Sequence, residues 1–273
     1  MKKLIVLSLI LFMGLPVNAK QDEYSVQYLQ SKRHFAVLNP LSEAVAQKAI
    51  KKSLKKQTNQ DFRVRIDGYN LKTFKEGIFK NLEISGEDLV LEEINIPYLK
   101  LKSMSDYNWI DYKQKPIQIK SDMVYSYEIY LSEQSINQAL DHKEYKKTLE
   151  KVNSTAYPLF VLKDVNIRVK NNKVYLIMEY NFPISPMKKN KIFTVSTGFK
   201  VLNNKITANE VYIDKSYGNL QSSKVSNLIN LLDPLSYTLS LLDDKKCNGK
   251  IENIKIIDNI VQINGKIYVK GNK

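Results

Sequence analysis

Residue types that carry catalysis or bind metals are few in this chain and widely spaced. The two histidines, His34 and His142, lie far apart in the sequence. A zinc site built on both would still need an acidic third ligand. The single cysteine, Cys247, lies in the charged, loop-like stretch "DDKKCNGK" with no evident general base beside it. We therefore predict surface or capping roles for the histidines, and a structural or merely exposed thiol.

Two pairs of adjacent acidic residues are the remaining candidates for chemistry. Glu92 and Glu93 are assigned to a predicted strand, where neighbouring side chains point to opposite faces and do not share a site. Asp243 and Asp244 lie beside lysines in a predicted loop that offers too few oxygen ligands for calcium. The chain also lacks a glycine-rich phosphate loop and a Gly-x-Ser-x-Gly motif. The sequence thus predicts no enzyme activity, no metal and no cofactor.

The first nineteen residues, "MKKLIVLSLILFMGLPVNA", predict a secretory signal peptide (1–19). Two lysines precede an apolar run, and a Val-Asn-Ala tripeptide ends at Ala19, where cleavage is expected. The alternative is an uncleaved anchor helix, but the run has about fourteen residues where a membrane span needs about twenty. We expect an exported protein of the periplasm or cell envelope, with a mature chain of 254 residues (273 − 19).

The formal net charge is strongly positive, at +14, and becomes +12 once Lys2 and Lys3 leave with the signal peptide (14 − 2). Nearly all of the excess is lysine, a compact hydrated charge and not the bidentate group that suits base recognition, so we expect no nucleic-acid partner. Two explanations stay open. A compositional bias toward lysine can decorate the solvent face, or the lysines can attract anionic lipid head groups.

Hydrophobic periodicity predicts three helical segments, each followed by strands. After a polar lead-in (20–39), an amphipathic helix is predicted from the single stripe Leu41, Val45, Ala46, Ala49, Ile50 and Leu54. A second helical segment starts at "SEQSINQAL", capped by Ser132, and continues to about Val152. The third runs from Ser222 until Pro234 stops it.

Between the helices the period of the pattern is two, which predicts strands with one wet face. Short turns at Asn171-Asn172, Asn203-Asn204 and Asp258-Asn259 predict hairpins, and sequential hairpins favour antiparallel pairing. The fold class is therefore α+β, mainly β. The order also suggests two similar passes, 40–131 and 132–270, as sub-repeats within a single domain (40–273).

Three segments together resemble the LmeA-like phospholipid-binding proteins, an exported bacterial family. "DFRVRIDGYNLKTFKEGIFKNLEISGEDLVLEEINIPYLKLKS" is similar to the family's N-terminal signature, including a G-x-x-x-x-L-x-I-x-G passage from Gly77 to Gly86. "YLSEQSINQAL" resembles its capped mid-domain helix, and "IENIKIIDNIVQINGKIYVKG" resembles its closing hairpin. The resemblance covers roughly residues 41–271, and its motifs are structural.

The resemblance implies a strongly curved antiparallel sheet wrapped around amphipathic helices in one elongated domain, as in tubular lipid-binding and bactericidal/permeability-increasing domains. It also implies phospholipid binding in the cell envelope, without a catalytic residue. A longer charged segment around 141–157 and the excess of lysine depart from the family pattern. These departures bear on which head group would be preferred.

The size of a lipid tail gives an independent reason for so much apolar, unreactive chain. An acyl chain of about fifteen methylenes exposes surface worth about 12 kcal/mol in water, and a strand of about eight residues runs about 26 Å, comparable with that chain. We expect the helix faces and the aromatic-rich strand to line an apolar groove. The candidate lipid-binding residues are Val45, Ile50, Leu54, Tyr125, Tyr127, Ile129, Val225, Leu228, Ile229 and Leu232. The alternative for each of them is ordinary packing in a filled core.

Three functional hypotheses follow. The first is a non-catalytic envelope protein that binds or transfers phospholipid in a groove between a curved sheet and helices, with peripheral contact to an anionic membrane. The second is a β-rich interaction or scaffold module with a packed core and a basic surface. The third is an unrecognised hydrolase, which would require coupled carboxylates with shifted pKa values in a cleft.

Overall fold

The computed structural model describes residues 39–111, 118–156, 160–183, 190–213, 221–242 and 248–271. Several predicted features lie outside these residues: the signal peptide with its cleavage position, His34, Cys247 and the Asp243-Asp244 pair. Within them, strands predominate and all the strand pairs are antiparallel. The predicted class, α+β and mainly β, is therefore confirmed.

The larger sheet has six strands, in the order β1-β3-β4-β7-β13-β12. Its strands are β1 (Arg63–Asp67), β3 (Asn81–Leu91), β4 (Ile94–Ser103), β7 (Met123–Ser132), β13 (Ile260–Val269) and β12 (Asn248–Ile257). A small three-stranded sheet has the order β2-β5-β6. Its strands are β2 (Ile78–Phe79), β5 (Asn108–Asp111) and β6 (Gln118–Ile119).

The second large sheet has four strands, in the order β11-β10-β9-β8. They are β8 (Val161–Lys170), β9 (Lys173–Asn181), β10 (Lys191–Leu202) and β11 (Lys205–Ile213). In β8 the alternation is almost strict: Val165, Ile167 and Val169 are buried, and the residues between them are exposed. One face of this sheet therefore packs into the core and the other meets solvent.

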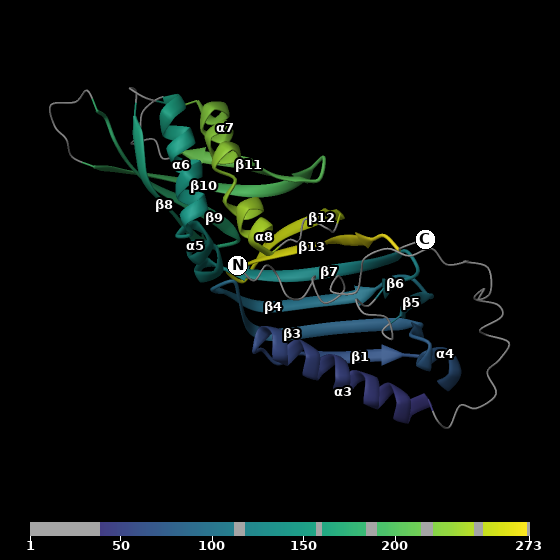
Figure 1. Ribbon diagram of the computed structural model, residues 1–273. Coiled ribbons are helices and arrows are strands. Elements are labelled where there is room, and N and C mark those ends of the chain that lie inside the picture. Colours follow the sequence, from purple (N-terminus) through teal and green to yellow (C-terminus); the bar gives the residue numbers. More distant parts are fainter. Residues whose placement is uncertain are drawn as a thin grey trace.

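Helices cover the two large sheets unequally. They are α3 (Asn39–Thr58), α4 (Leu71–Lys75), α5 (Glu133–Leu140), α6 (Lys143–Ala156), α7 (Ser222–Leu232) and α8 (Pro234–Leu242). The long helix α3 lies along the β1 edge of the six-stranded sheet, whereas α5, α6, α7 and α8 gather against the four-stranded sheet (Figure 1). Pro234 ends the predicted third helix, as expected, and also begins α8.

Among the described residues, four two-residue turns join hairpins, and both residues of each turn have positive φ. Three of them, at Asn171-Asn172, Asn203-Asn204 and Asp258-Asn259, confirm predicted hairpins. The fourth is Glu92-Glu93, with φ angles of 49° and 69°, between β3 and β4. The prediction that these glutamates lie in a strand is therefore wrong. Asparagine and aspartate tolerate the left-handed conformation and therefore predict a turn, whereas glutamate does not.

The alternation of buried residues in the β3–β4 hairpin shifts by one residue partway along its length. In β3 the buried positions are even-numbered from Leu82 to Gly86 and odd-numbered at Leu89 and Leu91. The strand β4 changes in the same place, between Ile96 and Leu99. The register is constant across this point, and Asp88 there has a φ of 49°. A Cβ atom on Gly86 would lie 2.7 Å from a methyl carbon of Leu89, so these two positions lie on the same side of the hairpin. The irregularity at Asp88 therefore shifts the alternation and keeps the same side buried.

Side-chain amides join the two large sheets. Asn204, in the β10–β11 turn, accepts a hydrogen bond from the backbone N–H of Ile251 (2.6 Å) and donates one to the carbonyl of Gly249 (3.2 Å), both in β12. On α5, Asn137 exchanges two hydrogen bonds with the backbone of Ile167 in β8, and Gln138 accepts one from Asn95 in β4 (2.8 Å). The helix α5 therefore bridges the two sheets.

The final hairpin crosses the boundary between the two predicted passes. It belongs to the second pass (132–270), yet β13 pairs along its whole length with β7 of the first pass. The hairpin thereby completes the six-stranded sheet. Two sub-repeats within a single domain stay a prediction, as does the strong curvature of the sheet, because strand pairing tests neither.

Candidate functional site

The three candidate residues on α3 do not share one environment. Leu54 is fully buried, and Ile50 is partly buried and packs against the core. Val45, in contrast, is 70% exposed. At 100° per residue, Val45 lies about 140° around the helix from Ile50. The prediction of a single inward stripe is therefore wrong, since Ile50 and Leu54 face the sheet while Leu41 and Val45 face outward.

The three candidates on β7 lie in the middle of the six-stranded sheet. Tyr125 and Ile129 are buried, and Tyr127 between them is partly buried and packs against the core. The hydroxyl of Tyr125 donates a weak hydrogen bond to the thioether of Met123 (3.4 Å). Burial in this apolar setting raises the pKa of Tyr125 far above its ordinary value. The phenol is therefore neutral at every physiological pH.

Tyr127 depends on a glycine in the neighbouring strand. It pairs directly with Gly265 of β13. A Cβ atom at position 265 would lie 2.6 Å from the Tyr127 ring and 2.1 Å from the carbonyl oxygen of Lys250. Both distances are far below van der Waals contact. Gly265 therefore makes the room in which the Tyr127 ring lies across the sheet.

The four candidates on α7 form its inward face. Val225, Ile229 and Leu232 are buried, and Leu228 is partly buried against the core. This face packs on β11, and Asn230 secures it there by accepting a hydrogen bond from the N–H of Ala208 (2.8 Å). The helical period therefore predicted the buried side of α7 correctly.

The candidates belong to one apolar cluster, but they do not converge on one point. Nine of the ten are members of a continuous hydrophobic cluster or pack directly against it, and Val45 is the exception. The α3 and β7 groups lie in the six-stranded part of the molecule and the α7 group lies over the four-stranded sheet (Figure 1). The cluster is therefore an apolar interior that runs from one sheet to the other.

The junction of α6, α7 and α8 contains polar groups that the sequence pattern did not single out. The rings of Tyr145 and Tyr237 are in contact, with centroids 4.9 Å apart and planes tilted by 53°. The hydroxyl of Tyr145 has no hydrogen-bond partner among the described residues. Burial, and next the negative charge of Asp233, raise the pKa of Tyr145. Burial also raises the pKa of Asp233, against the opposing hydrogen bonds from Ser236.

Shifted carboxyl groups do not occur as a pair within the described ranges. Asp233 has a raised pKa and lies between α7 and α8. Asp61 has a lowered pKa, because Lys55 donates a hydrogen bond to it and attracts its charge, and it is fully exposed. These two groups lie in different parts of the fold. They do not form the coupled pair that the hydrolase hypothesis requires.

Two further features concern the described residues only. They contain no group of three or more His, Cys, Asp or Glu side chains that could hold a metal ion. None of their helices has the length and apolar character needed to cross a membrane.

His142 directly precedes α6, where its carbonyl accepts a hydrogen bond from the N–H of Lys146 (3.3 Å), in keeping with the predicted capping position.

Comparison with known proteins gave no match. No protein-family model matches the chain, and neither a curated protein nor a solved structure matches it. The resemblance to the LmeA-like family therefore stays a prediction. The functional argument depends on the residues and contacts described above.

Proposed function

We propose that the protein is a non-catalytic lipid-binding protein of the cell envelope, which holds the acyl chains of a phospholipid against the six-stranded sheet and its helices. The observation that carries this proposal is the single apolar cluster that extends through both sheets. An acyl chain needs apolar contact along its whole length, because about 12 kcal/mol is lost when some fifteen methylenes return to water. A compact pocket would cover only part of it.

The dimensions of the six-stranded sheet suit such a ligand. The strands β4, β7, β12 and β13 have ten residues each, which corresponds to about 33 Å at the usual rise. Buried positions alternate along β13, and along β7 except at the partly buried Tyr127. Apart from Gly265, these positions carry apolar side chains on one face. A tail lying along these strands would meet an apolar side chain about every 7 Å.

Partly buried members of the cluster are the best candidates for direct contact with lipid. Ile50 on α3, Tyr127 on β7 and Leu228 on α7 all pack against the core while keeping some exposed surface. Fully buried residues such as Leu54 serve the fold whether or not lipid binds. Substitutions that test the proposal therefore belong at the partly buried positions.

Lipid extraction from natively purified protein is the direct test. We expect phospholipid in amounts comparable with the protein, detected by mass spectrometry of an organic extract. The variant Ile50→Asn is expected to lower the lipid-to-protein ratio. Ile192→Asn, at an isoleucine of β10 that is 62% exposed, is the matched control and is expected to keep the ratio. Repeated extraction of folded wild-type protein without any lipid would contradict the proposal.

A second candidate function is a β-rich interaction module with a filled core and a basic surface. The burial of Leu54, Tyr125 and Ile229, each at most 1% exposed, favours this alternative, because a filled core gives the same burial. The extraction experiment separates the two. Lipid-free protein that binds a protein partner or an anionic polymer would support the interaction module.

Export is part of the proposal. The predicted signal peptide supports it through its two lysines, its apolar run and the small residues that end at Ala19. N-terminal sequencing of the exported protein is expected to start at Lys20. A chain recovered from the membrane fraction with Met1 intact would instead support the uncleaved anchor.

A further inference from the structure

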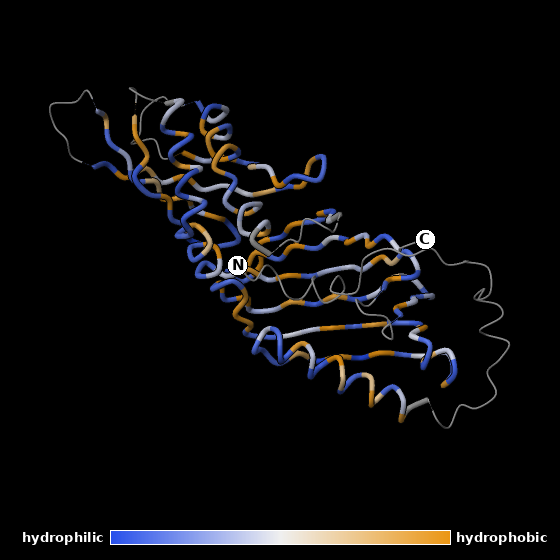
Figure 2. The backbone as a smooth tube through the Cα atoms, in the orientation of Figure 1, coloured by the Kyte–Doolittle hydropathy of each residue, from blue (hydrophilic) through white to orange (hydrophobic). Residues whose placement is uncertain are grey.

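The outward face of α3 combines the most exposed apolar side chains with a dense group of lysines. Leu41 and Val45 are 68% and 70% exposed, more than any other large hydrophobic side chain among the described residues. Farther along the helix, the exposed lysines are Lys48, Lys51, Lys52, Lys55 and Lys56. Spacings of three and four residues place all of these on one side of the helix. Figure 2 shows the resulting mixture of apolar and hydrophilic segments along α3.

Acidic groups do little to neutralise this face. Glu43 lies on the inward side, where its carboxylate accepts a hydrogen bond from the N–H of Gly68 (2.8 Å). Asp61 pairs with Lys55 at 3.0 Å. In the part of the chain that the structure describes, no carboxylate lies within ion-pair distance of the other four lysines. The face therefore presents a net positive charge.

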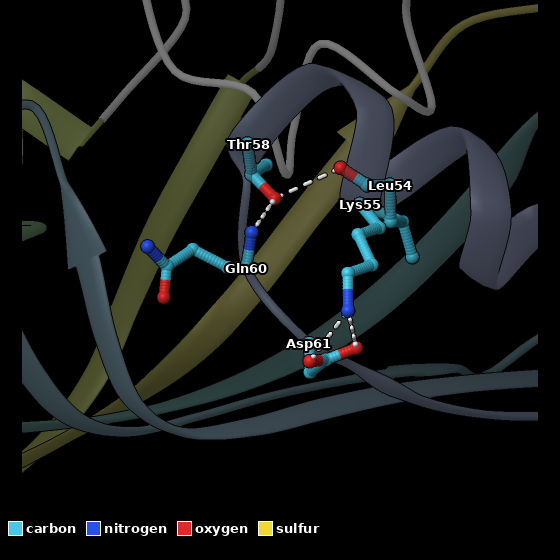
Figure 3. Close-up of polar contacts among 5 residues, drawn as sticks. All are labelled: Leu54, Lys55, Thr58, Gln60 and Asp61. Atoms are coloured by element: carbon cyan, nitrogen blue, oxygen red, sulfur yellow. Dashed lines mark hydrogen bonds and ion pairs between the residues drawn. The ribbon is translucent and has the colours of Figure 1, made fainter.

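The C-terminal end of α3 is held by several short-range contacts, shown in Figure 3. The hydroxyl of Thr58 donates to the carbonyl of Leu54 (2.8 Å) and accepts from the N–H of Gln60 (3.0 Å). Lys55 donates to both carboxylate oxygens of Asp61, at 3.2 and 3.0 Å. Beneath them, Leu54 is anchored in the core. The lysines are therefore presented on a fixed helix.

The helix α6 shows what an ordinary solvated helix face looks like in the same protein. Its exposed side carries four lysines, but Glu144 and Glu150 are interspersed among them. All of its exposed residues are polar, and its large apolar side chains Tyr145, Leu149 and Val152 are buried. Solvation alone therefore does not account for the exposed Leu41 and Val45 on α3.

We propose that the outward face of α3 docks the protein on an anionic lipid bilayer, with Leu41 and Val45 entering the interface and the lysines contacting head-group phosphates. Basic helices with apolar side chains on the same surface bind such interfaces through electrostatic attraction to anionic lipids and through burial of the apolar side chains. The inference deepens the proposed function and rests on it, because a carrier of phospholipid must meet a membrane to load or release its ligand. The proposal assigns this membrane contact to the outward face of α3.

The test compares two variants of equal charge in a vesicle co-sedimentation assay. One replaces four α3 lysines with glutamine: Lys48, Lys51, Lys52 and Lys56. The control does the same on α6: Lys143, Lys146, Lys147 and Lys151. Each lowers the net charge of the mature chain from +12 to +8 (12 − 4). The vesicles contain phosphatidylcholine with about a third phosphatidylglycerol, and pure phosphatidylcholine vesicles serve as the neutral comparison.

The α3 variant is expected to bind the anionic vesicles at least tenfold more weakly than wild type. One lysine near an anionic surface changes the binding constant about fivefold, so four exceed tenfold even when their contributions overlap. The α6 variant is expected to bind like wild type. Equal binding by wild type and the α3 variant would overturn the proposal, and so would equal losses in both variants.

The apolar part of the face has its own test. Replacing both Leu41 and Val45 with serine is expected to weaken binding to anionic vesicles about tenfold, whereas Leu202→Ser, at a leucine of β10 that is 55% exposed, is expected to change nothing. Unchanged binding by the double variant would refute insertion. Wild-type protein that binds heparin through the α3 lysines, but does not bind the vesicles, would assign the face to a soluble polyanion and refute the membrane proposal.

Failure of this inference is distinguishable from failure of the proposed function. Lipid recovered from purified protein reports on the interior, and vesicle binding reports on α3. Co-purified phospholipid together with equal vesicle binding by the two lysine variants would support lipid binding in the interior and refute docking through α3. Protein without lipid that still docks through α3 would keep only the docking surface.

Discussion

The two large sheets differ in how regularly buried and exposed residues alternate along their strands. In the four-stranded sheet one face stays buried, as the alternation along β8 shows, and the helices α5 to α8 lie against it. In the six-stranded sheet the buried positions of the β3–β4 hairpin change from even to odd numbers in β3, at Asp88, whose φ is 49°. The tip lies next to α5, whose Ser135 and Gln138 bond the backbone of Asn95. The irregularity at Asp88 keeps Leu89 on the same side as Gly86, so the strand itself accounts for the shifted alternation.

The largest expected effect comes from comparing a glycine of the six-stranded sheet with one of the four-stranded sheet. Gly265→Ala is expected to destabilise the fold by about 4 kcal/mol or more, because its Cβ would overlap the carbonyl of Lys250 and the Tyr127 ring. In the four-stranded sheet, Gly198→Ala would place its Cβ 3.4 Å from the carbonyl oxygen of Asn209, near ordinary contact.

Urea unfolding measures both free energies, with Gly249→Ala as the control. Position 249 lies in β12, and a Cβ there would meet nothing within 4 Å. The changes at 198 and 249 are expected to stay below about 1 kcal/mol. A Gly265→Ala protein as stable as wild type would mean that the β7–β13 register differs from the one described.

The shifted alternation at the hairpin tip can be tested by truncation. Ile96 is fully buried on the tip side, and Ile96→Ala is expected to cost about 3 kcal/mol of unfolding free energy. Ile167→Ala, equally buried in β8, is expected to cost a similar amount. Val90→Ala, at a residue that is 46% exposed, should cost less than about 0.5 kcal/mol. A large loss at Val90 with a small one at Ile96 would show that the alternation is not shifted at Asp88.

The turns at the ends of comparable hairpins give a stabilising prediction. Glu92 and Glu93 hold positive φ angles that cost glutamate about 1 kcal/mol each. Replacing the pair with Asn-Gly is expected to raise stability by about 1 to 2 kcal/mol in thermal unfolding. In the four-stranded sheet, the Asn171-Asn172 turn already has suitable residues, so Asn172→Gly should gain less. Equal gains in the two turns would mean that glutamate is not strained there.

The smallest expected effect concerns pH. Burial raises the pKa of Asp233 in the folded protein, so folding disfavours the charged form. Stability from this group is complete below the ordinary aspartate pKa and falls as the pH rises through the raised one. Asp233→Asn keeps the capping oxygen and should gain less than about 1 kcal/mol at pH 7, since solvent screens the partly exposed group. The gain should vanish near pH 3, whereas a gain of the same size at both pH values would contradict the buried-charge explanation.

Much of the local structure followed from the sequence. Alternating apolar residues predicted the antiparallel strands, and the turns at Asn171, Asn203 and Asp258 were readable because these residue types tolerate positive φ. The Glu92-Glu93 turn was missed because glutamate carries no such signal. The change of parity between Leu82–Gly86 and Leu89–Leu91 was visible in the sequence, but it coincides with Asp88 and not with the turn.

The candidate site was predicted in part. The helical period identified Val225, Ile229 and Leu232 as inward residues, and the strand period identified Tyr125 and Ile129. Val45 was misplaced because α3 carries apolar residues on both sides, so periodicity alone cannot say which side meets the sheet. The polar groups of the α6–α8 junction gave no usable signal, because isolated tyrosines occur throughout the chain.

The sequence by itself determined most of the segments that are helix, strand or turn, with the Glu92-Glu93 turn as an exception, since period and turn chemistry act over a few neighbouring residues. Only the tertiary structure decided that β13 pairs with β7, that α5 joins the two sheets, and that Leu41 and Val45 face outward. Those outcomes depend on partners 30 to more than a hundred residues away, or on which element covers a given face. No local pattern encodes them.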